Sequence, residues 1–390
     1  MGLIKVLVVE DSDLVADVLT QALESDRKIK VVGRATNGQE ALELVPKLNP
    51  DLITLDVWMP IMDGFETVER LMATNPTPIL VITSSSLKED VQLSLRMIAA
   101  GALDVMEKPS ITDDYQWKQQ QARLIAKVKL LAEVRVVTHL KGHAAVKGTA
   151  KTGDLKSPTQ PKIELVRKQT SPLPKPNLPT LPTANFPANP HYQVIAIASS
   201  TGGPTALLKI LQNLPPNFPG ALLLVQHISD GFTQGLVDWL NREIQLEIRI
   251  GKDGDVPKPG LILVAPDRRD MRIGFGRQIE TSADGQQILR PNGDILLASV
   301  ARSVGNRAIG LVLTGMGADG ALGLRQIRQA GGYTIAQDEA SSLIYGMPKA
   351  AYDNGGVTEV LALNGIARRL IELCQIGHNL AADNRFGGKP

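Results

Sequence analysis

The stretch Ile195-Ala-Ile-Ala-Ser-Ser-Thr-Gly-Gly-Pro204 decides how the second half of this chain folds. Residues 194–198 form an apolar run with the length of a buried strand. Glycine allows the sharp turn that follows, and proline suits the first position of a helix. Apolar residues then recur at helical spacing, at Ala206, Leu207, Ile210, Leu211 and Leu214. The stretch therefore predicts a parallel strand that leads directly into a helix.

Ser199, Ser200 and Thr201 lie at the carboxyl end of this predicted strand. Ligands and reactive groups collect at that edge of open α/β sheets, so we interpret Ser200 as a nucleophile. A polar turn followed by a helix N-cap is the alternative, because serine and threonine commonly cap helices. This stretch alone favours neither interpretation.

Two further apolar runs end in polar residues, at 221–227 and 308–314, and each precedes a helical pattern. The first closes on His227, and the second leads into a loop that contains Asp319. A serine hydroxyl is a weak nucleophile unless a base takes its proton, and imidazole suits that role at neutral pH. His227 is the one histidine inside this part of the chain, so it is the predicted base.

A carboxylate is expected to orient the imidazole. We favour Asp319 because glycines bracket its loop and allow close backbone approach. Asp230, Asp270 and Asp338 remain alternatives. The segment 315–317, Gly-Met-Gly, can present N–H groups toward an oxyanion.

Five motifs of this region together resemble the catalytic domain of the CheB family of chemotaxis protein-glutamate methylesterases. They are Ala198-Ser-Ser-Thr-Gly-Gly203, Gln226-His227 with Gly231-Phe232-Thr233, Leu313-Thr-Gly-Met-Gly-Ala-Asp-Gly320, Ala336-Gln-Asp-Glu-Ala-Ser341 and Gly346-Met347-Pro348.

The resemblance implies that Ser200 is the nucleophile, His227 the general base and Asp319 the orienting acid. It implies that the Met316 backbone amide helps form the oxyanion hole, and we group Thr201 with it as an oxyanion or substrate contact. The expected reaction is hydrolysis of glutamate methyl esters on chemoreceptors, with deamidation of receptor glutamines. No cofactor is expected for the hydrolysis.

The first third of the chain alternates strand-like and helix-like blocks. Five such repeats predict a doubly wound parallel sheet. Helical patterns occur between the strands, for example at 41–48 and 91–100. The predicted strands are 4–9, 29–32, 51–55, 79–82 and 103–106.

Acidic side chains follow two of these strands: Glu10 and Asp11 close the first, and Asp56 closes the third. Three converging carboxylates repel one another unless a cation neutralises them, and their oxygens suit Mg²⁺. A carboxylate beside that ion can become an aspartyl phosphate. Lys108 and the Thr83 hydroxyl, at two further strand ends, would contact the new anion.

Glu10-Asp11, Asp56, Thr83 and Lys108-Pro109 resemble the receiver domain of bacterial response regulators. The resemblance implies a flavodoxin-like fold and phosphorylation of Asp56 by a histidine kinase. It also implies that phosphorylation relieves an obstruction of the catalytic domain. Receivers often have an aromatic residue three positions before the lysine, and this chain has Val105 there.

The domain prediction is a receiver at 1–137, a disordered linker at 138–190, a Rossmann-like three-layer methylesterase domain at 191–376 and a disordered tail at 377–390. The linker holds nine of the 25 prolines and eight Lys or Arg against two acids, so it carries about +6 and the rest of the chain about −4. A tether of this length is expected to weaken docked inhibition by the receiver. The segment 265–270, Ala-Pro-Asp-Arg-Arg-Asp, departs from the family pattern and is expected to alter the receptor-facing rim.

The composition argues against several other classes of protein. An aromatic content of 4% disfavours nucleic-acid binding by base stacking, and the single cysteine, Cys374, excludes a disulfide framework. We find no export signal and no apolar run long enough to span a bilayer, so we expect a cytoplasmic monomer without membrane insertion.

Two other functions are weighed against the hydrolase. A phospho-switched adaptor would bind receptors or kinase without catalysis, and the Ser-His-Asp set argues against it. A transcriptional regulator would need a recognition helix after the linker, and we find none.

Overall fold

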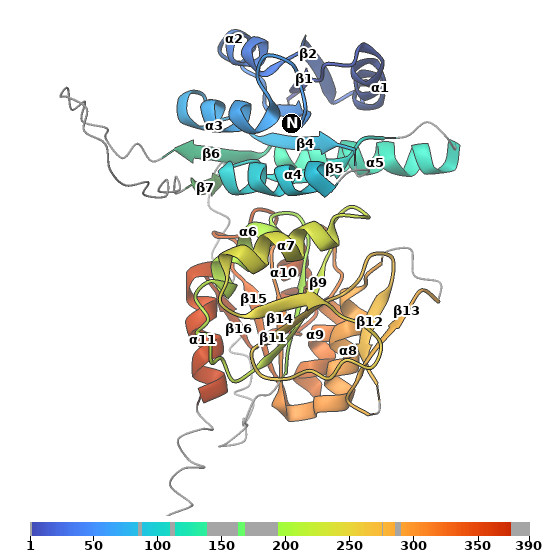
Figure 1. Cartoon of the computed structure of the whole chain (residues 1–390), viewed down its shortest axis with the longest axis vertical. Coiled ribbons are helices and arrows are strands. Elements are labelled where there is room, and N and C mark those ends of the chain that lie inside the picture. Colours follow the sequence, from blue (N-terminus) through green and yellow to red (C-terminus); the bar gives the residue numbers. More distant parts are fainter. Residues whose placement is uncertain are drawn as a thin grey trace, which may run out of the picture. The chain divides into compact units, whose positions relative to one another are not determined.

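The computed structural model describes residues 2–84, 88–109, 114–138, 163–167, 194–274, 276–284 and 290–375. Two parallel sheets organise these residues, one of five strands and one of seven, and Figure 1 labels their elements. The fold class predicted from the sequence, two doubly wound α/β domains, is confirmed. None of the helices in the described part of the chain has the length and apolarity needed to cross a membrane.

The first sheet has the strand order β2-β1-β3-β4-β5, with parallel pairing of β1 to β2 and β3, and of β3 to β4. All five strands lie within a few residues of their predicted positions. The strands are β1 (Ile4–Val9), β2 (Ile29–Ala35), β3 (Leu52–Leu55), β4 (Ile79–Thr83) and β5 (Asp104–Glu107). The helices are α1 (Asp13–Glu24), α2 (Gly38–Leu48), α3 (Gly64–Thr74), α4 (Lys88–Ala100) and α5 (Asp114–Leu131).

The second sheet has the strand order β10-β11-β9-β8-β14-β15-β16, and its described pairs are all parallel. Its strands are β8 (Val194–Ser199), β9 (Ala221–Gln226), β10 (Glu247–Ile250), β11 (Leu261–Val264), β14 (Ala308–Val312), β15 (Tyr333–Gln337) and β16 (Glu359–Leu361). A separate antiparallel hairpin consists of β12 (Asp270–Ile273) and β13 (Ile279–Ser282).

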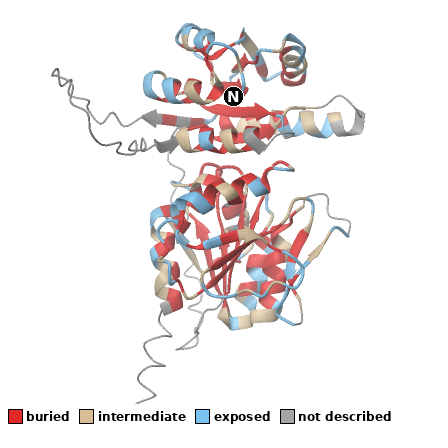
Figure 2. Ribbon diagram, viewed as in Figure 1, coloured by how far each residue is buried: buried red, intermediate tan, exposed pale blue. Residues whose placement is uncertain are grey.

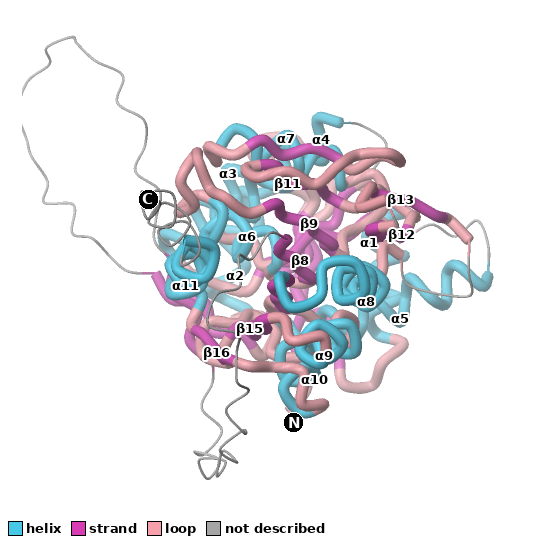
Figure 3. The backbone as a smooth tube through the Cα atoms, turned by 90° about the horizontal axis from the view of Figure 1, so that it is seen from below, coloured by secondary structure: helices cyan, strands magenta, loops and turns pink. Residues whose placement is uncertain are grey.

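Helices cover both faces of this second sheet, as Figure 3 shows. One face carries α6 (Gly203–Leu211), α7 (Thr233–Glu243) and α11 (Leu363–Gln375); the other carries α8 (Gly293–Val304), α9 (Ala321–Gln329) and α10 (Met347–Asp353). A short 3₁₀ turn, η1 (Gly305–Arg307), links α8 to β14. The arrangement has the three layers predicted for the catalytic domain.

Buried residues concentrate on the strands and on the helix faces that meet them (Figure 2). On the α8 and α9 side, one core joins Leu223 and Val225 of β9 to Leu297 of α8 and Leu324 of α9. Burial of each such side chain contributes about 1.5–3 kcal/mol. This core holds α8 and α9 against the same face of the sheet.

One described segment of the predicted linker forms a short strand. β7 (Ile163–Arg167) pairs antiparallel with β6 (Val134–Thr138), which follows α5. Residues 163–167 read Ile-Glu-Leu-Val-Arg, and such β-branched and aliphatic residues favour strands. The rest of the predicted linker, and the predicted tail at 377–390, lie outside the described residues.

Helix α2 begins at an N-cap that the structure shows in detail. The buried Asn37 side chain accepts the Glu40 N–H at 3.0 Å, and the Glu40 carboxylate accepts the Thr36 N–H at 2.8 Å. Two of the N–H groups at the start of the helix thus have side-chain partners.

We expect Asn37→Ala to destabilise the five-stranded domain by about 1 kcal/mol, because one helical N–H loses its acceptor. Hydrogen–deuterium exchange of the full chain should show faster exchange in residues 38–48. Gln21→Ala, on the exposed face of α1, is the control and should leave exchange unchanged. Equal exchange in the Asn37 variant and the wild type would contradict the capping role.

Candidate functional site

The turn after β8 positions Ser200. Gly202 has φ +77°, and a Cβ there would lie 2.7 Å from Leu343 Cβ, so both conformation and space require glycine. Helix α6 begins at Gly203, with Pro204 in its first turn. The Ser200 N–H donates to the Thr314 carbonyl at 3.0 Å. Ser200 therefore lies at the carboxyl end of β8, as predicted, and its backbone is hydrogen-bonded to the segment just after β14.

A buried glutamine joins the Ser200 turn to His227. The Gln226 Nε2 donates to the Ser200 and His227 carbonyls, both at 2.8 Å, and its Oε1 accepts the Ser199 hydroxyl at 2.7 Å. The His227 N–H also donates to the Ser199 carbonyl at 2.9 Å. These contacts hold the backbones of the candidate nucleophile and base in one arrangement.

Asp319 is the carboxylate that faces His227. Its Oδ2 lies 2.8 Å from the His227 Nε2, and its side chain is 9% exposed. The N–H groups of Gly293 and Asp294 donate to its two oxygens at 2.6 and 3.0 Å. Burial raises the pKa of Asp319, but His227 and the two amides lower it by a larger amount. The pKa is therefore below the usual aspartate value.

The aspartates that the sequence left as alternatives have other partners. Asp230 accepts from the Arg268 guanidinium at 2.7 Å. Asp270 accepts the Asn292 N–H at 2.9 Å, and Asp338 accepts the Ser341 N–H at 3.0 Å. The geometry therefore favours Asp319 among the four.

The Asp319 contact also distinguishes the two ring nitrogens of His227. An ionised carboxylate only accepts hydrogen bonds, so Asp319, 2.8 Å from Nε2, favours the tautomer of His227 with its proton on Nε2. Nδ1 is then the nitrogen with a free lone pair, and it is the atom that could take a proton from a hydroxyl.

The loop after β14 contains the candidate oxyanion donor. The Gly315 N–H donates to the Ile344 carbonyl at 3.0 Å, so that amide is already engaged. A Cβ at Gly315 would lie 2.7 Å from the Ser200 Cβ, which places Ser200 against this loop. Met316 is the next residue, and its backbone N–H is the better candidate for the oxyanion donor.

The Thr201 carbonyl accepts the Thr314 hydroxyl at 3.0 Å, so the backbone of Thr201 helps to hold the turn after β8.

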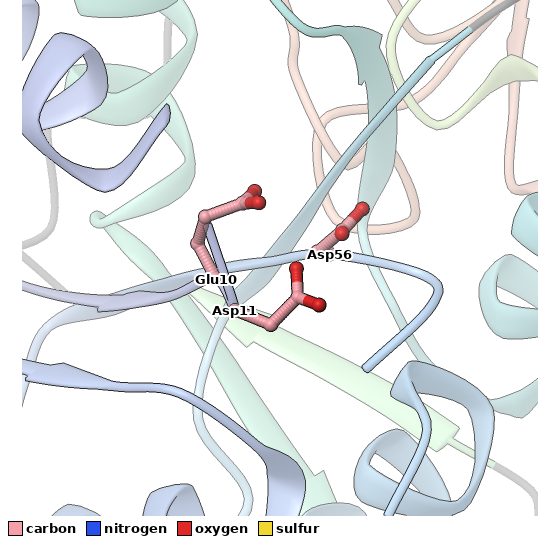
Figure 4. A group of neighbouring side chains, drawn as sticks. All are labelled: Glu10, Asp11 and Asp56. Carbon is pink, nitrogen blue, oxygen red and sulfur yellow. The ribbon is translucent and has the colours of Figure 1, made fainter. Parts of the chain in front are cut away.

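Three carboxylates gather at the edge of the five-stranded sheet (Figure 4). One oxygen each from Glu10, Asp11 and Asp56 lies within 4.8 Å of the others. Glu10 and Asp56 are buried and Asp11 is exposed. Asp56 Oδ1 also accepts the Val57 N–H at 2.8 Å. Such an all-oxygen set with one open side fits Mg²⁺, which retains waters and accepts phosphate oxygens.

Thr83 and Lys108 lie at two neighbouring strand ends of the same sheet. Thr83 is the last residue of β4, and the Lys108 N–H just after β5 donates to the Thr83 carbonyl at 2.8 Å. Val105 is a buried residue of β5. The topology thus brings the five predicted receiver residues to one edge of the sheet.

Comparisons with known proteins match both domains of the chain. A family model described as CheB methylesterase matches residues 195–370, and one described as response regulator receiver domain matches 6–116. A protein-glutamate methylesterase/protein-glutamine glutaminase from Syntrophus aciditrophicus is 38% identical over 95% of this chain and 98% of its own length. The chain belongs to the protein-glutamate methylesterase/protein-glutamine glutaminase family. The resemblance found in the sequence is confirmed.

Two further relatives of the family are similar over different spans. A second protein-glutamate methylesterase/protein-glutamine glutaminase, from Anaeromyxobacter dehalogenans, is 38% identical over 95% of this chain and 97% of its own length. The crystal structure of the Thermotoga maritima CheB methylesterase catalytic domain is 34% identical, with a TM-score of 0.45, over 46% of this chain and 98% of that chain.

The residues that hold Asp319 were not predicted from the sequence. Gly293 and Asp294 were not singled out, although Asn292-Gly-Asp294 before an apolar run is an N-cap signal. Gln226 was quoted only as part of a motif, and nothing in a single sequence indicates that its side chain joins two loops.

We expect Asp319→Asn to destabilise the second domain by about 2 kcal/mol at pH 7, because an amide cannot accept from three donors. The pKa of Asp319 is lowered in the fold, so the charged carboxylate stabilises the fold above the unfolded value of about 3.8. That contribution is lost only as the pH falls through the lower folded value. The difference from wild type in urea unfolding should therefore not shrink between pH 7 and pH 5.

Asp338→Asn, at the end of the neighbouring strand β15, is the matched control and should change stability less. A difference that already shrinks between pH 7 and pH 5 would contradict the lowered pKa of Asp319.

Proposed function

We propose that this chain is a phosphorylation-activated serine hydrolase that demethylates glutamate methyl esters on chemoreceptors and deamidates receptor glutamines. Its nucleophile is Ser200, its general base His227 and its orienting acid Asp319. The observation that carries the proposal is the 2.8 Å contact between His227 and Asp319, at strand ends next to that of Ser200. The family membership supports the substrate class.

The proposed reaction has two steps. The Ser200 Oγ attacks the ester carbonyl carbon while its proton moves to His227 Nδ1, and the Met316 amide stabilises the oxyanion. Methanol leaves with the proton from His227, and a glutamyl ester of Ser200 remains. Water then attacks this ester with His227 as base and releases the glutamate carboxylate. With a glutamine substrate the leaving group is ammonia.

Asp319 serves both steps through charge and orientation. It keeps the imidazole in one tautomer and stabilises the imidazolium that forms when His227 accepts the Ser200 proton. Burial raises its pKa, but His227 and the Gly293 and Asp294 amides lower it by more, so the carboxylate stays charged across the neutral range. Hydrolysis needs no cofactor in this scheme.

The receiver is the proposed switch. Asp56 accepts a phosphoryl group from a chemotaxis histidine kinase, and Glu10, Asp11 and Asp56 would hold the Mg²⁺ that this transfer requires. When bound, Mg²⁺ would neutralise the charge of the phosphoryl oxygens. Thr83 and Lys108 then contact the phosphate. We propose that the receiver spans 1–137 and the catalytic domain 191–376, and that the protein acts as a monomer in the cytoplasm.

We expect Ser200→Ala to lower methanol release from methylated receptor membranes by at least about 10⁴-fold, because the nucleophile is lost. The neighbouring Ser199→Ala removes one hydrogen bond to Gln226 and should cost less than tenfold. Full activity of the Ser200 variant would refute the assignment. Receptor binding by the wild type without methanol release would favour a non-catalytic adaptor.

We expect a small phosphodonor with Mg²⁺ to raise wild-type methanol release at least about fivefold, the lower range of allosteric coupling. Asp56→Asn and metal chelation should each abolish the rise. Asp63→Asn is the control, because Asp63 caps α3 in the same loop by accepting the Glu66 N–H. Stimulation that persists in the Asp56 variant would exclude Asp56 as phosphoacceptor.

A further inference from the structure

Helices α8 and α9 pack against each other (Figure 3), and both begin close to Asp319. The first N–H groups of any helix lack partners within it. The N-cap of α8, Asn292, accepts only the Ile295 N–H, and the N-cap of α9, Gly320, has no side chain. Both helices therefore need further acceptors from elsewhere in the fold.

Asp319 supplies the acceptors for α8. It precedes α9 in the chain, yet it accepts the first two N–H groups of α8, those of Gly293 at 2.6 Å and Asp294 at 3.0 Å. The positive end of the α8 dipole also favours its negative charge. The carboxylate that faces His227 is thus fixed by the start of a different helix.

Asp294 supplies the acceptor in the opposite direction. It lies in the first turn of α8, and its Oδ1 accepts the Gly323 N–H of α9 at 2.8 Å. The two aspartates therefore exchange caps: each lies at the start of one helix and caps the other.

Two glycines allow this exchange. A Cβ at Gly293 would lie 2.9 Å from the Asp319 Oδ2, and a Cβ at Gly323 would lie 2.8 Å from the Asp294 carbonyl oxygen. Larger residues at either position would push the helix starts apart. Glycine at both positions therefore allows the starts of α8 and α9 to lie this close together.

We propose that Asp294 is a positioning residue for the reaction, which acts by holding the Asp319 loop so that the Asp319 carboxylate stays against His227. This inference rests on the proposed function. Asp294 holds Asp319 by its backbone N–H and holds the start of α9, four residues beyond Asp319, by its side chain.

The ionisable groups around the exchange come from several elements. His227 follows β9, and Asp270 of β12 contributes a second buried carboxylate that Arg290 faces at 3.4 Å. Burial raises the pKa of Asp294, and the charge of Asp319 raises it further, against the lowering effect of the α9 amides. A change at Asp294 can therefore act in two ways: through the loss of a negative charge near Asp319, and through the loss of the hydrogen bond to α9. Two variants are needed to separate these effects.

Asp294→Ala removes both the acceptor and the charge, whereas Asp294→Asn keeps an acceptor oxygen and removes only the charge. We expect the alanine variant of the full chain to lower kcat for methanol release about 10–100-fold with KM within twofold, because the misplaced carboxylate affects the reaction and not substrate binding. The asparagine variant should recover to within about threefold of wild type.

The matched control is Asp255→Ala. Asp255 also accepts a backbone N–H, that of Lys252 at 2.7 Å, and pairs with Arg249, but it lies between β10 and β11. We expect this variant to lose thermal stability while kcat is unchanged. If Asp294→Ala does not fold, Asp294→Ser takes its place, with a shorter oxygen acceptor and an intermediate kcat expected.

A second measurement does not depend on turnover. With ¹⁵N-labelled histidine, the Nε2–H signal of His227 should be sharp and downfield in the wild type, lost or broadened in Asp294→Ala and retained in Asp294→Asn. Wild-type kcat and an intact signal in Asp294→Ala would overturn the inference. A wild-type chain that shows the signal but releases no methanol would instead refute the proposed function.

Discussion

The second domain depends on providing hydrogen-bond donors to the buried carboxylate of Asp319. A charge with 9% exposure is costly unless it is hydrogen-bonded, and here the Gly293 and Asp294 amides and the His227 ring provide the partners. These groups come from α8 and from the end of β9, so one side chain joins three segments that are distant in the sequence. The start of α8, the packing of α9 and the orientation of the imidazole all depend on this cluster.

Much of the second domain is predictable because its central strands are continuous apolar runs that end in polar residues. Ser200, His227 and Asp319 were found in this way, each just after such a run. The sequence favours Asp319 over Asp230, Asp270 and Asp338 through its glycine-bracketed loop, but its partners at 293 and 294 belong to a helix about 25 residues earlier and are seen only in the structure. The outer strands were not predicted: β10 and β16 are only three or four residues long and partly exposed, and periodicity is weak over so short a span.

The first domain was predictable for the same reason, and the acids that follow β1 and β3 converge because parallel strands end at one edge. In the linker, the many prolines and lysines give no sign of the short segment at 163–167, which forms β7 through pairing with β6. Such a strand is determined by its partner across the sheet and not by its own composition.

The neighbouring positions of β9, β8 and β14 limit how this enzyme can vary in length. Ser199 pairs with Gln226 across β8 and β9, and Ala198 pairs with Val312 across β8 and β14. Insertion of a single residue in any of these strands would move its catalytic end by about 3.3 Å and reverse the direction of every following side chain. Evolutionary drift in loop length should therefore accumulate at the amino edge of the sheet, where deletions and insertions leave the spacing of the three reactive groups intact.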